Sequence, residues 1–203
     1  AVHGALHHLG DNDAVYYMGR GIESIFVRAS GTGMYWFLSM SETLLPPALR
    51  DPAGILAAMS PRFDNTFRAI TSATGDMRVD DLADRDALPE WSRGPVTLLG
   101  DAAHPLLPHT GQGAAQAMVD AVRLAEHLSA GSIPEALRGY ERDRIPKTRA
   151  LLAQGRRTAR LQAMTNPIVC GLRELVIRAI PVTTFARFFV KVNRRAGTDV
   201  RRG

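Results

Sequence analysis

The sequence predicts a mixed α/β (α+β) fold in which antiparallel strands come first and helices follow. Three short runs rich in β-branched and aromatic residues, separated by glycines, fall within the first forty residues. From Gly113 onward, apolar residues recur with a helical period. With 203 residues, 45% of them apolar, the chain is long enough to bury a core. Its length fits one domain, or one domain and a piece of another.

The first elements are predicted to be antiparallel strands at residues 14–19, 23–30 and 33–40. In the third run, alternation places Tyr35 on one face of the sheet and Trp36 on the other. Both faces of this run are largely apolar. The sheet should therefore be covered on both sides, in part by a ligand.

The middle of the chain is predicted to alternate turns with short elements. A short helix should follow the turn at 45–54, and Phe63, Phe67 and Ile70 recur at the spacing of a second helix. Residues 76–82 are predicted to form a short strand. The continuous apolar run at 96–99 is typical of a strand that is buried on both faces.

Helices are predicted for most of the remaining chain. The helix from Gly113 has an apolar stripe at positions 114, 118, 121/122, 125 and 128. The Ser-Ile-Pro-Glu run at 132–135 predicts a capping box, and Pro146 should separate a helix at 134–143 from one at 146–165. Asn166 and Pro181 should bound a further helix, and a last segment places Phe185, Phe188, Phe189 and Val192 on one face.

Charge and cysteine content exclude some classes of protein. Residues 138–203 carry 16 Lys and Arg against 4 Asp and Glu, whereas residues 1–137 carry 9 against 16. A basic region can bind nucleic acid or an anionic membrane surface, or it can pack against the acidic half of the chain. We expect no nucleic acid partner and favour packing over membrane contact. The single cysteine excludes an internal disulfide framework. The absence of a leader or an apolar run of membrane-spanning length predicts a cytoplasmic protein.

The stretch from residue 96 to 116 concentrates the chemistry. Its apolar run ends at Gly100, where the lack of a Cβ lets another group approach closely. Asp101 then lies at the carboxyl end of the predicted strand, a common ligand position in α/β folds, where its carboxylate can accept hydrogen bonds from sugar-like hydroxyls. Gly111 and Gly113 expose backbone N–H groups where a helix begins, and such an end favours an anionic or electron-rich ligand. Together they predict a ligand cradle.

The run GDAAHPLLPHTGQGAAQAMVDAVRLAEHL at 100–128 resembles the GD motif of group A FAD-dependent monooxygenases, the para-hydroxybenzoate hydroxylase-like flavoproteins. The flanking runs LPEWSRGPVTLLGD and YERDRIPKTRALLAQGRR are similar to the family's sequences on either side of that motif, and the early strands resemble its substrate domain more loosely. The resemblance covers roughly residues 15–165. It implies a C-terminal portion of a two-domain FAD/NAD(P)-binding flavoprotein.

The resemblance also implies roles for individual residues. Asp101, next to Gly100, would bind the ribityl chain of FAD, and Gly111, Gln112 and Gly113 would place N–H groups near the pyrimidine edge of the flavin. The segment from Pro108 to Thr110 would lie over the ring near the oxygen-activating carbon, which makes Pro108 and His109 the implied catalytic residues. Tyr35 and Trp36 would line the substrate pocket, although core packing explains either of them equally well.

The implied reaction is a hydroxylation. NADPH or NADH would reduce FAD, O2 would add to give a flavin hydroperoxide, and one oxygen would pass to a small aromatic substrate. Related flavoproteins of this fold that reduce or halogenate remain an alternative. So does a non-catalytic module whose basic helices bind a partner.

The family's other two motifs are missing from these residues. No Gly-X-Gly-X-X-Gly follows a strand and opens a helix, and no Asp-Gly pair occurs anywhere. The expected partner is therefore the N-terminal FAD-binding half, without which the chain should be inactive. The expected parts are a substrate-domain portion at 1–75, an FAD-domain portion at 76–130 and a helical region at 131–203.

Several residues also have simpler interpretations. His104 is interpreted as a structural histidine bonded to backbone, and Cys170 as a small core residue. A metal site built from Asp101, His104 and His109 is not expected, because the ligand spacing is poor and no fourth ligand is evident.

Overall fold

The computed structural model describes residues 2–3, 5–29, 33–46 and 48–180. The chain divides into two compact units. The first comprises residues 1–81 with 162–172, and the second comprises residues 82–161 with 173–203. The predicted segment around Phe185 to Val192 lies outside the described residues.

The first unit is built on a four-stranded antiparallel sheet with strand order β1-β4-β3-β2. Its strands are β1 (Val2–His3), β2 (Ala14–Met18), β3 (Ile22–Arg28) and β4 (Gly33–Met40). The pairing register sets Tyr17 opposite Ser24 and Phe26 opposite Trp36. This sheet confirms the three predicted strands.

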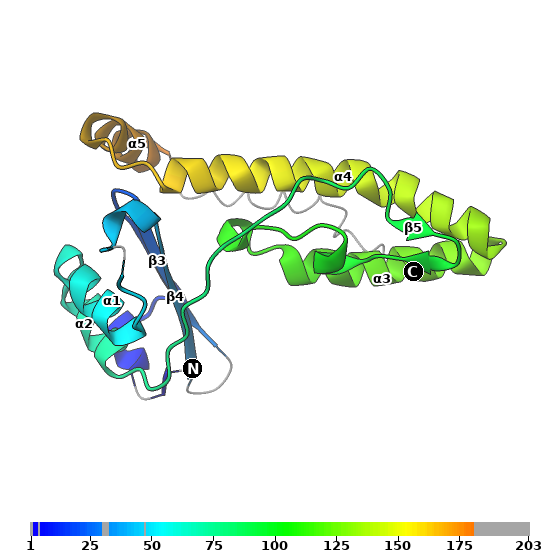
Figure 1. Ribbon diagram of the computed structural model, residues 1–203. Coiled ribbons are helices and arrows are strands. Elements are labelled where there is room, and N and C mark those ends of the chain that lie inside the picture. The colour runs from blue at the N-terminus through cyan, green and yellow to red at the C-terminus, as the bar shows by residue number, and fades with distance from the viewer. Residues whose placement is uncertain (1, 4, 30–32, 47, 181–203) are drawn as a thin grey trace. The chain divides into compact units, whose positions relative to one another are not determined.

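Two helices cover one face of this sheet (Figure 1). They are α1 (Pro52–Met59) and α2 (Asn65–Ser72), joined by a 3-10 turn at Ser60–Arg62. Asp51 and Asp64 cap them, each carboxylate accepting a backbone N–H from the first turn. Phe26 and Phe67 are fully buried at the centre, their rings 5.6 Å apart in an edge-to-face contact. Both helices lie where the sequence predicts them.

A buried carboxylate lies in the same unit. The Glu23 carboxylate accepts hydrogen bonds from the hydroxyl of Tyr16, at 2.5 Å, and from the side-chain amide of Gln162. Glu23 is only 2% exposed, so these bonds satisfy a group that would be costly to bury alone.

The second unit begins with a hairpin of two short strands, β5 (Ser92–Arg93) and β6 (Val96–Thr97). Its longest elements are the helices α3 (Gly113–Ala130) and α4 (Ile133–Gln162, whose last residue belongs to the first unit), which run alongside each other (Figure 1). Its apolar core is formed by Trp91, Ala103 and Tyr140.

The helix α5 (Pro167–Ala179) is divided between the two units and begins at the predicted cap. The side chain of Asn166 accepts the N–H groups of Ile168 and Val169, at 3.0 and 3.3 Å. Cys170 is buried as expected. No helix in the described ranges combines the length and apolarity that a membrane crossing needs.

Two strand predictions are wrong. Residues 76–82 have no regular secondary structure. The run at 96–99 contributes only two residues to a hairpin, and Val96 and Leu99 are exposed rather than buried. The reason is that β6 pairs only with β5 among the described residues, so no parallel neighbours flank it there.

Two helix predictions also need correction. α4 continues through Pro146, because Arg144, Thr148 and Leu151, on either side of the proline, are all buried and hold the helix together. The apolar stripe of α3 is exposed, with Met118 at 67% and Val122 at 44%. The buried face instead carries Gln116, Val119 and Asp120.

Ser132 and Glu135 pair at the start of α4, which confirms one half of the predicted capping box. The Ser132 backbone N–H and hydroxyl both donate to the Glu135 carboxylate, at 3.3 and 2.6 Å. These bonds favour the ionised form and lower the pKa of Glu135.

Candidate functional site

Gly100 forms the sharp bend between the hairpin and the site. Leu99 is extended, and Gly100 has φ +57°, in the left-handed region. A Cβ added at Gly100 would lie 3.0 Å from the Cβ of Ala117 on α3. The N–H groups of Ala103 and His104 both donate to the Gly100 carbonyl, at 2.9 and 2.8 Å. Backbone conformation and close packing therefore both require glycine here.

Asp101 is exposed on the resulting 3-10 turn at Gly100–Ala102. Its carboxylate lies close to the beginning of α3. A Cβ built on Gly113, the first residue of that helix, would be 3.9 Å from the Asp101 Oδ1. The turn thus brings a solvent-accessible carboxylate beside a helix N-terminus.

The loop between these groups is tightly turned. A second 3-10 turn spans Pro108–Thr110 and ends at Gly111, which has φ +63° and whose N–H donates to the Pro108 carbonyl at 2.8 Å. A Cβ at Gly111 would meet nothing within 4 Å, so this glycine is needed for its conformation rather than for space. His109 is half-buried on this turn.

The N-terminus of α3 is not capped by the side chain of its N-cap residue. Gln112 occupies that position, makes no side-chain cap hydrogen bond and is buried, and its Oε1 has no hydrogen-bond partner. The N-terminus of this 18-residue helix carries a partial positive charge and N–H groups that need acceptors. This end therefore fits an electron-rich ligand.

A buried polar network lies directly behind the turn. Asp120 Oδ2 accepts the Gly100 N–H at 2.8 Å and lies 2.5 Å from His104 Nε2. Asp120 Oδ1 accepts from Arg144 Nε at 2.6 Å, and another nitrogen of the same guanidinium donates to Gln116 Oε1, also at 2.6 Å. All four side chains are at most 1% exposed. The network joins the turn, α3 and α4.

Asp120 remains ionised in this network. Burial alone would raise the pKa of its carboxyl group, but the hydrogen bonds from His104, the Gly100 N–H and Arg144 outweigh burial and lower it. The opposite shift occurs next to it, where burial and the charge of Asp120 raise the pKa of the Tyr140 phenol. The interior of this unit thus holds a carboxylate paired with an arginine.

The structure places the two predicted substrate residues on opposite faces of the first unit's sheet. Trp36 packs against the core, its ring stacked on Phe26, and its indole N–H donates to the Thr74 hydroxyl at 2.9 Å. Tyr35 is 60% exposed on the other face, where its ring contacts Phe37. Of the two, Tyr35 is the residue that a ligand can reach.

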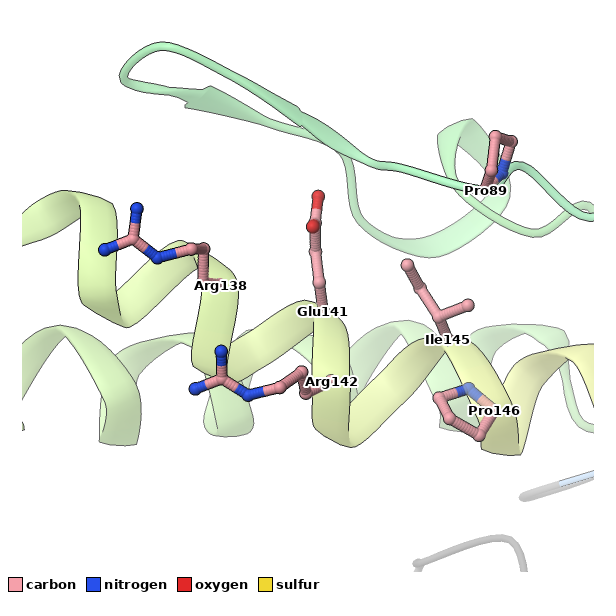
Figure 2. A pocket seen from close by; sticks show the side chains of 6 residues that line it. All are labelled: Pro89, Arg138, Glu141, Arg142, Ile145 and Pro146. Atoms are coloured by element: carbon pink, nitrogen blue, oxygen red, sulfur yellow. The ribbon is translucent and has the colours of Figure 1, made fainter.

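A separate open depression of about 440 Å³ lies along α4 and contains none of the predicted site residues. Its lining residues are Pro89, Arg138, Glu141, Arg142, Ile145 and Pro146 (Figure 2). Glu141 points from α4 toward the hairpin segment, and its Oε1 accepts the N–H groups of Trp91 and Ser92 at 2.7 and 2.5 Å. Glu141 therefore anchors the hairpin that leads into Gly100.

Part of the chain is similar to known FAD-binding proteins. Residues 69–154 match the family model described as FAD binding domain. The 3-amino-4-hydroxybenzoate 2-monooxygenase of Streptomyces cremeus is 38% identical over 130 residues, which are 63% of this chain and 33% of that protein. The aurachin C monooxygenase/isomerase of Stigmatella aurantiaca is 38% identical over 109 residues, 53% of this chain and 28% of that protein.

This chain is similar to group A FAD-dependent monooxygenases over the matched residues. The fold agrees. Klebsiella pneumoniae HpxO, solved with FAD and uric acid, superposes with a TM-score of 0.82 at 22% identity, covering 97% of this chain and 51% of HpxO. CtdE, solved with FAD and a substrate, gives a TM-score of 0.63 at 25% identity over 76% of this chain and 41% of CtdE. The chain therefore spans about a third of these curated relatives and about half of HpxO.

Sequence reasoning missed the residues behind the turn. The bond from His104 goes to the Asp120 carboxylate and not to a backbone carbonyl. Gln116 and Asp120 are spaced one helical turn apart, and that spacing of polar residues was the available signal for a second, polar face of α3. Arg144 carried no comparable signal, because it is one of many arginines in this region of the chain.

Proposed function

We propose that this chain forms the flavin-loop and substrate-face portion of an FAD-dependent monooxygenase that hydroxylates a small aromatic compound, with NADPH or NADH as reductant and O2 as co-substrate. The observation that carries the proposal is the exposed Asp101 carboxylate beside the start of α3. When bound, FAD supplies the redox and oxygen chemistry, and the protein positions it.

The residues around the turn fit such a cofactor. The Asp101 carboxylate would accept hydrogen bonds from the ribityl hydroxyls. The Gly111 N–H already donates to the Pro108 carbonyl, so of the three predicted N–H groups those of Gln112 and Gly113 would face the pyrimidine rim. Partial positive charge at this helix end would stabilise the electron-rich reduced ring there. Pro108 and His109, on the turn just before Gly111, would lie against the ring and limit the access of water.

The substrate would bind against the face of the sheet that carries Tyr35. Tyr35 and Phe37 offer an aromatic surface there, since their ring centroids are 6.4 Å apart. Trp36 would support this face from behind by filling the core under β4. Several relatives are named for hydroxylation of hydroxybenzoates, which favours an aromatic acid of that size as the first substrate to test.

The partner would be a segment that supplies the Gly-X-Gly-X-X-Gly unit. The exposed apolar stripe of α3, with Met118 and Val122 at its centre, provides a surface for it, as do Val96 and Leu99 on and just after β6. Alone, the chain should bind FAD weakly and consume no NAD(P)H.

The test compares the chain alone with the chain joined to a segment carrying the Gly-X-Gly-X-X-Gly unit. FAD binding is followed by flavin fluorescence, and NAD(P)H oxidation is followed with a panel of hydroxybenzoates. Tight FAD binding and formation of hydroxylated product only in the joined protein are expected. NAD(P)H consumption without oxygen insertion into any substrate would point instead to a reductase.

A further inference from the structure

We propose that Asp120 and Arg144 are positioning residues that hold the Asp101 turn and the Gly-Gln-Gly segment in one fixed arrangement. This inference rests on the proposed function for its purpose, and on the hydrogen bonds of the buried network for its geometry. Neither residue is exposed to a ligand, so each acts through other residues.

The first link runs from Asp120 to the turn. Its Oδ2 accepts the Gly100 N–H and contacts His104 Nε2, and the His104 N–H in turn donates to the Gly100 carbonyl. One carboxylate oxygen therefore holds both ends of the turn. Asp101 follows Gly100 directly, so its backbone direction is fixed by this contact.

The second link runs from Arg144 to the Gly-Gln-Gly segment. Its guanidinium donates to Gln116 Oε1, and the Gln116 N–H donates to the Gln112 carbonyl at 2.9 Å. Gln112 and Gln116 are thus one turn apart at the start of α3. Arg144 bonds to Asp120 with one nitrogen and to Gln116 with another, which makes it the bridge between the two halves of the cradle.

Because the network is buried, the protein depends on both of its charged partners. Removing one partner of a buried charge pair strongly destabilises a protein, because the other charge is left uncompensated. Four polar atoms in or beside this network lack partners, namely Gln112 Oε1, Gln116 Nε2, His104 Nδ1 and Arg144 Nη1.

The first experiment needs no cofactor. Amide hydrogen exchange at Gly100 is measured in the 203-residue chain and in the variants Asp120→Asn and Asp120→Ala. Glu126→Gln is the matched control, because Glu126 is an exposed carboxylate of the same helix as Asp120 and pairs with Arg123. We expect exchange at Gly100 to rise roughly tenfold or more in Asp120→Ala and to stay unchanged in the control.

A second pair of variants keeps the test decisive if the Asp120 variants do not fold. His104→Gln retains an N–H donor near the position of Nε2, whereas His104→Leu removes it. Slow Gly100 exchange should be retained in His104→Gln and lost in His104→Leu. Equal exchange at Gly100 in both, with an equal loss of thermal stability, would overturn the inference.

The last experiment separates this inference from the proposed function. FAD affinity and the flavin reduction potential are measured in the assembled enzyme, for the folded fraction of each variant. Weaker FAD binding and a shifted potential in Asp120→Asn, with Glu126→Gln unchanged, support a positioning role. Unchanged FAD affinity despite lower thermal stability overturns that role and leaves the proposed function standing. An unmodified enzyme that binds no FAD overturns the proposed function instead, while the exchange result still decides the loop geometry.

Discussion

Asp120 accepts the backbone N–H of Gly100 at 2.8 Å, although the two residues are twenty positions apart and belong to different elements. The contact matters because Gly100 precedes the exposed Asp101 and has a left-handed backbone conformation. A buried carboxylate on a helix thus sets the direction of a surface carboxylate on a turn.

The ionisation of Asp120 predicts acid sensitivity. Its pKa is lowered from the ordinary value of 3.8, even though burial raises it, because His104, the Gly100 N–H and Arg144 stabilise the carboxylate. The unfolded chain therefore binds this proton more tightly, and the stability that the carboxylate contributes is present above pH 3.8 and lost as pH falls through the folded pKa.

Thermal denaturation from about pH 6 to pH 2 measures this contribution. We expect the melting temperature of Asp120→Asn to fall less steeply below about pH 4 than that of the unmodified chain. If the melting temperatures of the two proteins fall in parallel as the pH is lowered, the ionisation of Asp120 does not contribute to stability. Arg144 and Tyr140 also face this carboxylate, so Tyr140→Phe serves as a control that leaves the titrating group in place.

The glycines of the site should differ in their tolerance of alanine. Gly100→Ala meets both a positive φ and a Cβ contact at 3.0 Å with Ala117, and should lower the free energy of unfolding by about 2 kcal/mol or more. Gly111→Ala meets only the positive φ and should cost about 1 kcal/mol. Gly75→Ala, with open space and no positive φ, should change stability by less than about 0.5 kcal/mol. Urea unfolding ranks them, and an equal effect at all three would contradict this account.

Pro146 should be a destabilising residue. It is exposed in the interior of α4, where it lacks the N–H that would bond to Arg142 and crowds the preceding turn. Pro146→Ala should therefore raise the free energy of unfolding by about 1–3 kcal/mol. Pro134→Ala is the control, since Pro134 lies in the first turn of the same helix, where proline costs little. A loss of stability in Pro146→Ala would mean that α4 is kinked there.

The sequence predicted elements whose signal is local. Phe63, Phe67 and Ile70 predicted α2 because their spacing alone places them on one face, and Ser132 and Glu135 predicted a cap because the two residues bond to each other. Likewise the glycines at 100 and 111 predicted the turns at which they occur.

The sequence failed where a residue's environment depends on distant elements. The apolar run from Val96 to Leu99 suggested a buried strand. Burial on both faces needs neighbouring strands, and the sequence of the run does not show whether such neighbours are present. The stripe of α3 suggested the buried face, but the buried face is the one bearing Asp120, because Arg144 of α4 neutralises it. No local pattern joins positions 120 and 144.

The exposed stripe of α3 predicts an assembly defect without a folding defect. Met118 is 67% exposed, so Met118→Glu should leave the melting temperature of the chain nearly unchanged. It should weaken association with the segment that supplies the Gly-X-Gly-X-X-Gly unit, because a charge would be buried in an apolar contact. Met118→Leu preserves the apolar surface and is the control. Pull-down with the tagged segment reads out association, and unimpaired binding of Met118→Glu would place the interface elsewhere.

The most direct measurement is an FAD titration of the assembled enzyme carrying Asp101→Ala, with Asp76→Ala as a control at another exposed aspartate. Loss of charge-assisted hydrogen bonds to the cofactor should weaken FAD binding by roughly tenfold to a hundredfold in Asp101→Ala and leave the control unchanged. Equal FAD affinity in Asp101→Ala and the unmodified enzyme would contradict the assignment of this turn as the flavin site.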